Sequence, residues 1–179
     1  MSLDIVAIEF LQQFRNPVFS ALSVLLNVLF SHFVVLPATL ALWAFYKKKK
    51  FFTIFAAALT TYAAAFVLKE VVARPRPDYI ISEMVLDSST NSFPSAHAAI
   101  TFMLALMLYQ KYPRLGKVLF VLAFLTAFTR VYSGAHYLTD VIAGAVLGLA
   151  VGYLFLRNEQ KVLDLEAKIH KRLAAIFSS

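Results

Sequence analysis

The chain has 179 residues, of which 60% are hydrophobic and 15% are charged, whereas a soluble domain is ordinarily about 45–50% apolar and about 25% charged. This composition excludes a soluble globular protein and a disordered chain, and the absence of cysteine from the sequence excludes a disulfide scaffold. The net charge of +7 is typical of membrane anchoring segments, and no basic run interleaves with aromatic residues, so we expect a membrane protein with no nucleic-acid partner.

Five segments are long and apolar enough to cross a bilayer, which requires about 20 mostly apolar residues. They are Val18–Tyr46, Phe51–Val72, Phe93–Gln110, Leu115–Tyr132 and Tyr137–Leu156. The first is overlong, which leaves open one bent or tilted helix or a short interfacial piece followed by a span, and we count it as one. The expected fold is therefore an all-α, polytopic membrane helix bundle with about five transmembrane helices.

The two ends of the chain, residues 2–15 and 158–177, carry apolar residues at helical spacing and predict interfacial helices. We expect residues 1–179 to form a single membrane-embedded domain. Gly144, Gly148 and Gly152 recur at four-residue intervals on the last span, which permits close approach of a neighbouring helix. We favour packing within the chain over a dimer seam.

Basic residues decide the orientation of the spans. If the Lys47–Lys50 run after the first span is cytoplasmic, twelve of the 17 Lys and Arg residues lie inside and five lie outside. The positive-inside rule thus predicts an outer N-terminus and a cytoplasmic C-terminus.

Polar and ionisable residues collect at the outer ends of the spans, where they are costly to keep unless they have a function. Those at the span ends are Lys69, His97, Arg130, His136 and Asp140, and those in or beside the outer loop are Arg74, Arg76, Ser95, Asp78, Glu83 and Asp87. An excess of fixed cations, with Ser95 at the start of a helix, favours binding of a phosphate. By contrast, we interpret His32 as a packing residue and His170 as part of a solvated helix face.

His136 and Asp140 are four residues apart and would share one face of a helix. The carboxylate could then accept one N–H of the imidazole and turn the other nitrogen toward a substrate, as in an activated nucleophile. The sequence carries neither a paired-carboxylate nor a His-rich ligand pattern, so we expect no metal and no other cofactor.

Three ordered segments resemble the signature of the type 2 phosphatidic acid phosphatase superfamily. They are Lys69 and Arg76-Pro77 with six residues between them, then Pro94-Ser95-Ala96-His97, then Arg130 with His136 and Asp140. The resemblance covers residues 69–140, and the surrounding helical frame is similar to that of small bacterial members. Two positions depart from it, because Ala96 stands where Gly is frequent and Thr129 where Ser usually precedes the arginine. Neither departure removes a titrating group.

The resemblance implies a metal-independent membrane lipid phosphatase. In such an enzyme His136 attacks the phosphorus, Asp140 orients His136, and His97 protonates the leaving oxygen. The phosphoryl oxygens would be held by Lys69, Arg76, Ser95 and Arg130. The implied substrate is undecaprenyl diphosphate, lipid A 1-phosphate or phosphatidylglycerol phosphate, and the implied location is the bacterial inner membrane with the site facing outward. Two alternatives remain open: a phosphotransferase between lipids and a non-catalytic carrier of lipid head groups.

Overall fold

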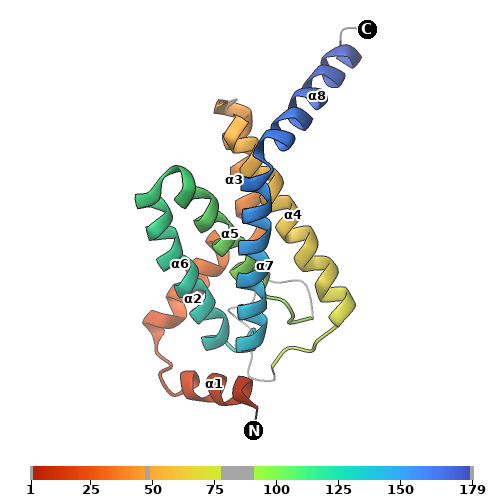
Figure 1. Cartoon of the computed structure of the whole chain (residues 1–179). Coiled ribbons are helices and arrows are strands. Elements are labelled where there is room, and N and C mark those ends of the chain that lie inside the picture. The colour runs from red at the N-terminus through yellow and green to blue at the C-terminus, as the bar shows by residue number, and fades with distance from the viewer. Residues whose placement is uncertain (1, 47–48, 78–90, 178–179) are drawn as a thin grey trace.

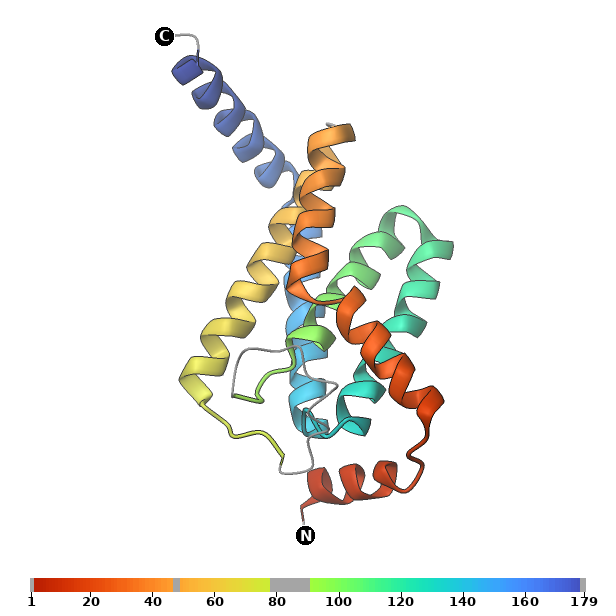
Figure 2. The same ribbon diagram turned by 180° about the vertical axis from the view of Figure 1, so that it is seen from behind.

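The computed structural model describes residues 2–46, 49–77 and 91–177, and the regular structure in these ranges is helical (Figures 1 and 2). In chain order the helices are α1 (Leu3–Gln12), α2 (Pro17–Leu29), α3 (His32–Tyr46), α4 (Lys49–Val72), α5 (Ala96–Lys111), α6 (Pro113–Tyr132), α7 (Leu138–Arg157) and α8 (Glu159–Phe177). Local sequence sets several starts, since Asn16 caps α2 ahead of Pro17 and Ser95 caps α5. The predicted all-α membrane bundle is confirmed.

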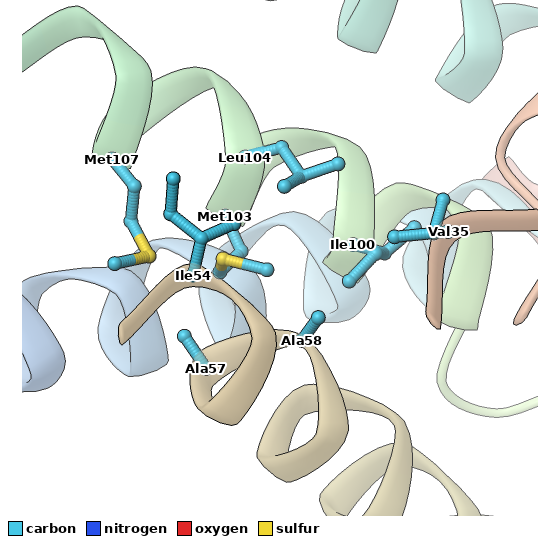
Figure 3. Close-up of a cluster of buried hydrophobic side chains, with 8 residues drawn as sticks. All are labelled: Val35, Ile54, Ala57, Ala58, Ile100, Met103, Leu104 and Met107. Carbon is cyan, nitrogen blue, oxygen red and sulfur yellow. The ribbon is translucent and has the colours of Figure 1, made fainter. Parts of the chain in front are cut away.

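The central helix of the bundle is α5, which packs most extensively against α6 and α7 and also contacts α4. Ten of its sixteen residues are buried. In the core cluster of Figure 3, small Ala57 and Ala58 of α4 face the larger side chains of α5, and this lets the two helices approach closely. The cluster is completed by Val35, Ile54, Ile100, Met103, Leu104 and Met107.

Glycines allow α7 to lie directly against α5. A Cβ atom added at Gly144 would collide with the carbonyl oxygen of Ser95, and one added at Gly148 would collide with that of Ala99. At Gly152 the nearest neighbours would be 3.4 Å away, an ordinary contact. The glycine stripe therefore serves packing within the chain, as the sequence indicates.

The predicted count of five spans is not confirmed. In the described part of the chain, three helices are long and apolar enough to cross a membrane, at Phe51–Val72, Pro113–Tyr132 and Leu138–Arg157. A fourth span is possible if α2 and α3 are taken together. The predicted segment Phe93–Gln110 gives only the 16 residues of α5, about 24 Å of helix against a hydrocarbon core of about 30 Å. Phe93, Pro94 and the N-cap Ser95 precede the helix, so the predicted segment is longer than the helix that forms.

The overlong segment Val18–Tyr46 is two helices that meet at 46°. The break falls at Phe30 and Ser31, six residues before Pro37, which lies inside α3. Ser31 Oγ donates a hydrogen bond to the carbonyl of Val28 at 2.8 Å, and Tyr62 Oη donates to the carbonyl of Phe30 at 2.8 Å. The Val28 carbonyl also accepts the backbone N–H of Ser31 at 3.2 Å, so side chains and backbone together satisfy the carbonyl oxygens at the break.

The predicted terminal helices lie at opposite ends of the bundle. Figures 1 and 2 show α1 lying across the end at which α7 begins, whereas α8 extends from the other end. Leu3, Phe10 and Phe14 in and after α1 are more than half exposed. A hydrogen bond of 2.9 Å from Trp43 Nε1 to Glu166 Oε1 holds α8 to α3.

Candidate active site

The predicted site residues come from the ends of four helices. Lys69 lies in the last turn of α4, Ser95 and His97 begin α5, Arg130 lies in the last turn of α6, and Asp140 lies in the first turn of α7. These five residues and His136 are all at most 5% exposed, and Arg76 is half-buried. Asp78, Glu83 and Asp87 of the outer loop lie outside the described residues, as do the side chains of Lys47–Lys50 and His170.

A tight turn between α6 and α7 presents His136. Gly134 has φ of 66°, a conformation that an L side chain disfavours, and its N–H donates to the carbonyl of Val131. The chain then folds back so that the His136 N–H donates to the carbonyl of Arg130 at 3.2 Å. The nucleophile candidate and a phosphate-binding candidate are thus joined through the backbone.

The side chains of His136 and Asp140 are adjacent, but not because they share one face of a helix. His136 precedes α7, and Asp140 Oδ2 folds back to accept the N–H of Tyr137 at 2.9 Å as part of a capping box. His136 Nδ1 lies 3.7 Å from the same oxygen, within reach of an ion pair but longer than a hydrogen bond. Both side chains are fully buried.

The three predicted phosphate-binding cations each contact a neutral oxygen. Lys69 Nζ donates to the carbonyl of Asn91 at 2.8 Å, and Arg76 Nη1 donates to the carbonyl of Ala135 at 3.0 Å. Arg130 Nη1 donates to the side-chain amide oxygen of Asn27 at 2.9 Å. A neutral acceptor orients a cation without cancelling its charge, so these contacts are compatible with binding of an anion.

Ser95 joins the second signature segment to the third. Its backbone N–H donates to the carbonyl of Asp140 at 3.0 Å, and its hydroxyl caps α5 by accepting the N–H of Ala98. The start of α5 is therefore fixed against the start of α7, at the point where Gly144 permits a close approach.

Asn27 contacts two of the candidate site residues and was not assigned by the sequence analysis. It is 1% exposed, and it contacts both Arg130, through its side chain, and His97, whose Nε2 lies 3.2 Å from the Asn27 carbonyl oxygen. A carbonyl oxygen only accepts, so His97 Nε2 carries the hydrogen in this contact. The available signal was a buried amide in an apolar segment, which is a mark of function in membranes.

Arg74 is the second residue that was not assigned. Its Nη1 donates to Asp140 Oδ1 at 2.7 Å, so both oxygens of Asp140 accept hydrogen bonds from groups other than His136. Ser92 secures the backbone of this segment, because its N–H donates to the carbonyl of Arg74 at 2.7 Å. The sequence placed Arg74 in the polar cluster without a partner.

His32, interpreted as a packing residue, lies against the rings of Phe33 and Tyr62.

Two curated relatives from Bacillus subtilis (strain 168) are similar in sequence. One is phosphatidylglycerophosphatase B, 36% identical over 107 residues, a match that covers 54% of this chain and 51% of that protein. The other is undecaprenyl-diphosphatase BcrC, 25% identical over 142 residues, covering 75% of this chain and 74% of that protein. The chain spans about half the length of several curated relatives that it matches.

The fold is similar to that of a solved structure, and a family model covers most of the chain. The crystal structure of Aquifex aeolicus LpxE superposes with a TM-score of 0.74 at 26% identity, over 88% of this chain and 96% of that one. The model of the PAP2 superfamily matches residues 50–164, a range that includes every predicted site residue. The chain therefore belongs to the PAP2 superfamily.

Proposed function

We propose that this protein is an integral membrane phosphatase that removes a phosphoryl group from a lipid phosphate or diphosphate through a phosphohistidine intermediate. One observation carries the proposal: two histidines, an aspartate and two cations are buried, and a third cation, Arg76, is half-buried, at the helix ends on one side of an apolar bundle. Binding alone needs the cations, whereas the histidine and aspartate pair supplies a nucleophile and its orienting group. This favours catalysis over the alternative of a head-group carrier.

The chemistry begins with His136. Its Nδ1 faces Asp140 at 3.7 Å, which leaves Nε2 as the attacking nitrogen. Nε2 forms a bond to phosphorus while the bond from phosphorus to the leaving oxygen breaks, and His97 transfers a proton to that oxygen. Water then attacks the phosphohistidine, His97 takes the proton of that water, and inorganic phosphate leaves with His136 neutral again.

Lys69, Arg76 and Arg130 supply the electrostatic part of the mechanism. Their charges stabilise the negative charge that the phosphoryl oxygens carry in the transition state, and Ser95 adds a hydroxyl and the start of α5. The parts of the chain that the structure describes hold no group of three metal-ligating side chains. In our proposal the three cations do the work that a divalent ion does in many phosphatases, and the reaction needs no metal.

The substrate proposal rests on the membrane setting and on what the relatives are named for. The names of the two Bacillus subtilis proteins refer to phosphatidylglycerophosphate and undecaprenyl diphosphate, and lipid A 1-phosphate is the third candidate from the family resemblance. The decisive experiment is to measure phosphate release by the purified protein from these three lipids in detergent micelles. We expect release from at least one lipid, unchanged by excess chelator, and much slower release from glycerol 3-phosphate, which lacks acyl chains.

Other outcomes of this assay discriminate the alternatives. Phosphate that appears on an added lipid alcohol rather than in solution would identify a phosphotransferase. Binding of the lipids without turnover would identify a carrier, and loss of activity with chelator, restored by Mg²⁺ or Zn²⁺, would refute metal independence.

We further propose that the protein resides in the bacterial inner membrane as a single domain with the site facing the periplasm or exterior. The basic residues of the helix ends away from the site support this orientation. Because the chain has no cysteine, single substitutions can be labelled selectively. In intact cells, Arg15→Cys at the site end should react with a membrane-impermeant thiol reagent, and Lys117→Cys at the opposite end should react only after permeabilisation. The reverse pattern would place the site in the cytoplasm.

A further inference from the structure

Arg74 lies between two carboxylates that are far apart in the sequence. Its Nη2 donates to Asp4 Oδ2 at 2.9 Å, and its Nη1 donates to Asp140 Oδ1 at 2.7 Å. The guanidinium carbon also lies 3.8 Å from the centre of the Tyr137 ring. Charge-assisted hydrogen bonds from the two terminal nitrogens to two separate carboxylates fix both the position and the orientation of the guanidinium group.

Asp4 fastens α1 to this arginine and to the start of α7. Oδ1 of Asp4 accepts the backbone N–H of Thr139 at 3.0 Å, and Oδ2 accepts the Thr139 hydroxyl at 2.8 Å. Burial alone would raise the pKa of Asp4, but the hydrogen bonds from Arg74 and Thr139 outweigh burial and hold the pKa below its ordinary value. Asp4 is therefore ionised at neutral pH, and α1 is bound beside Asp140 by charge-assisted contacts.

These contacts separate Arg74 from the cations that bind phosphate in our proposal. A guanidinium shared by two carboxylates has its positive charge balanced and its terminal nitrogens directed at protein oxygens. Membrane anchoring does not account for it either, because the charged end points toward a fully buried carboxylate rather than toward the bilayer surface. What Arg74 can do in this position is hold Asp140.

We propose that Arg74 and Asp4 are positioning residues of the active site, so that α1 acts as a structural part of it. Arg74 holds Oδ1 of Asp140, and this keeps Oδ2 directed at His136, while Asp4 holds Arg74. The inference rests on the proposed roles of His136 and Asp140. It predicts that a helix outside the family signature controls the reactivity of the nucleophile.

The test compares Arg74→Gln and Asp4→Asn on whichever lipid of the panel is hydrolysed fastest. We expect Arg74→Gln to lower kcat about 10- to 100-fold, in line with loss of a hydrogen bond to a charged group, and to change KM less than about threefold. Asp4→Asn keeps the oxygen that accepts the Thr139 N–H but replaces the one that accepts from Arg74. It should lower kcat about three- to tenfold.

The double variant decides whether the two residues act as a unit. If Asp4 acts through Arg74, Asp4→Asn has no further effect on kcat in the Arg74→Gln background. Arg15→Gln is the matched control, because Arg15 is an exposed arginine just after α1, and it should leave kcat and KM unchanged. Thermal unfolding in detergent identifies variants that fail to fold, and Asp4→Asn then carries the test alone.

Two results would overturn the inference without touching the proposed function. A raised KM with unchanged kcat in Arg74→Gln would show that Arg74 binds the phosphate directly. Multiplicative losses in the double variant would show that Asp4 and Arg74 act independently. Failure of the proposed function has a different signature, since it appears as turnover that persists in His136→Ala.

Discussion

Replacing His136 with alanine should lower kcat by about 10⁴-fold or more, while the protein still folds and is extracted by detergent as before. In the proposed mechanism His136 supplies the only bond that forms to phosphorus in the first step. The cations Lys69, Arg76 and Arg130 cannot replace that bond. They still position the substrate, so the variant should remain somewhat faster than the uncatalysed reaction in water. Phosphate release and thermal unfolding of the purified variant measure the two effects separately.

The matched control is His32→Ala, which removes a histidine of α3 whose described ring contacts are with Phe33 and Tyr62. Its turnover should remain within a few-fold of wild type. A second readout is covalent: a phosphoryl group that is labile in acid and stable in alkali should appear on the protein after rapid quenching, and should be missing in His136→Ala. Substantial turnover by that variant would eliminate the covalent mechanism.

The sequence analysis named candidate site residues that the structure brings to one end of the bundle, but it did not predict most of their contacts. Local spacing was sufficient to bring His136 near Asp140, because a turn and a capping box are determined by neighbouring residues. The predicted hydrogen bond between them does not form, since His136 Nδ1 is 3.7 Å from Asp140 Oδ2, and the two Asp140 oxygens accept instead from Arg74 and from the N–H of Tyr137. The first of these partners lies 66 residues away in the sequence.

Asn27 and Asp4 illustrate why long-range partners were not predicted. Asn27 is 103 residues from Arg130, and Asp4 is 70 residues from Arg74. Hydrophobic periodicity reports which face of a helix is apolar, but it carries no information about which distant polar group that face meets. Such pairings follow from how elements far apart in the sequence pack together, here α2 with α6 and α1 with the segment after α4.

The fold shows a similar division between local and global information. Composition and segment length were sufficient to predict an all-α membrane bundle. The break between α2 and α3, by contrast, involves contacts with side chains that are distant in the sequence. Tyr62 and His97 contact the carbonyl oxygens of Phe30 and Asn27 near the break, and both residues are distant in sequence. A helix interrupted in this way also places an acceptor beside His97, so the interruption contributes to the site.

The loss caused by His97→Ala should depend on the leaving group. His136 must be neutral to attack, while His97 must be protonated to donate to the leaving oxygen. An alkyl alkoxide leaves poorly without a proton, so the variant should lose about 10²- to 10⁴-fold in kcat/KM on a lipid phosphomonoester. An activated aryl phosphate scarcely needs an acid, so on this substrate the kcat/KM of the variant should fall about tenfold or less.

The pH dependence of the same variant supplies an independent check. The wild-type profile of kcat/KM on the lipid should be bell-shaped, because His136 must be neutral to attack while His97 must be protonated to donate. Its two limits belong to the coupled pair. Removal of His97 should abolish the fall in kcat/KM at high pH, since that fall reports loss of the proton from the general acid. The fall at low pH should remain, because it reports protonation of His136. Equal losses on the lipid and the aryl phosphate, with the bell intact, would show that His97 binds phosphate or shapes the site instead of donating the proton.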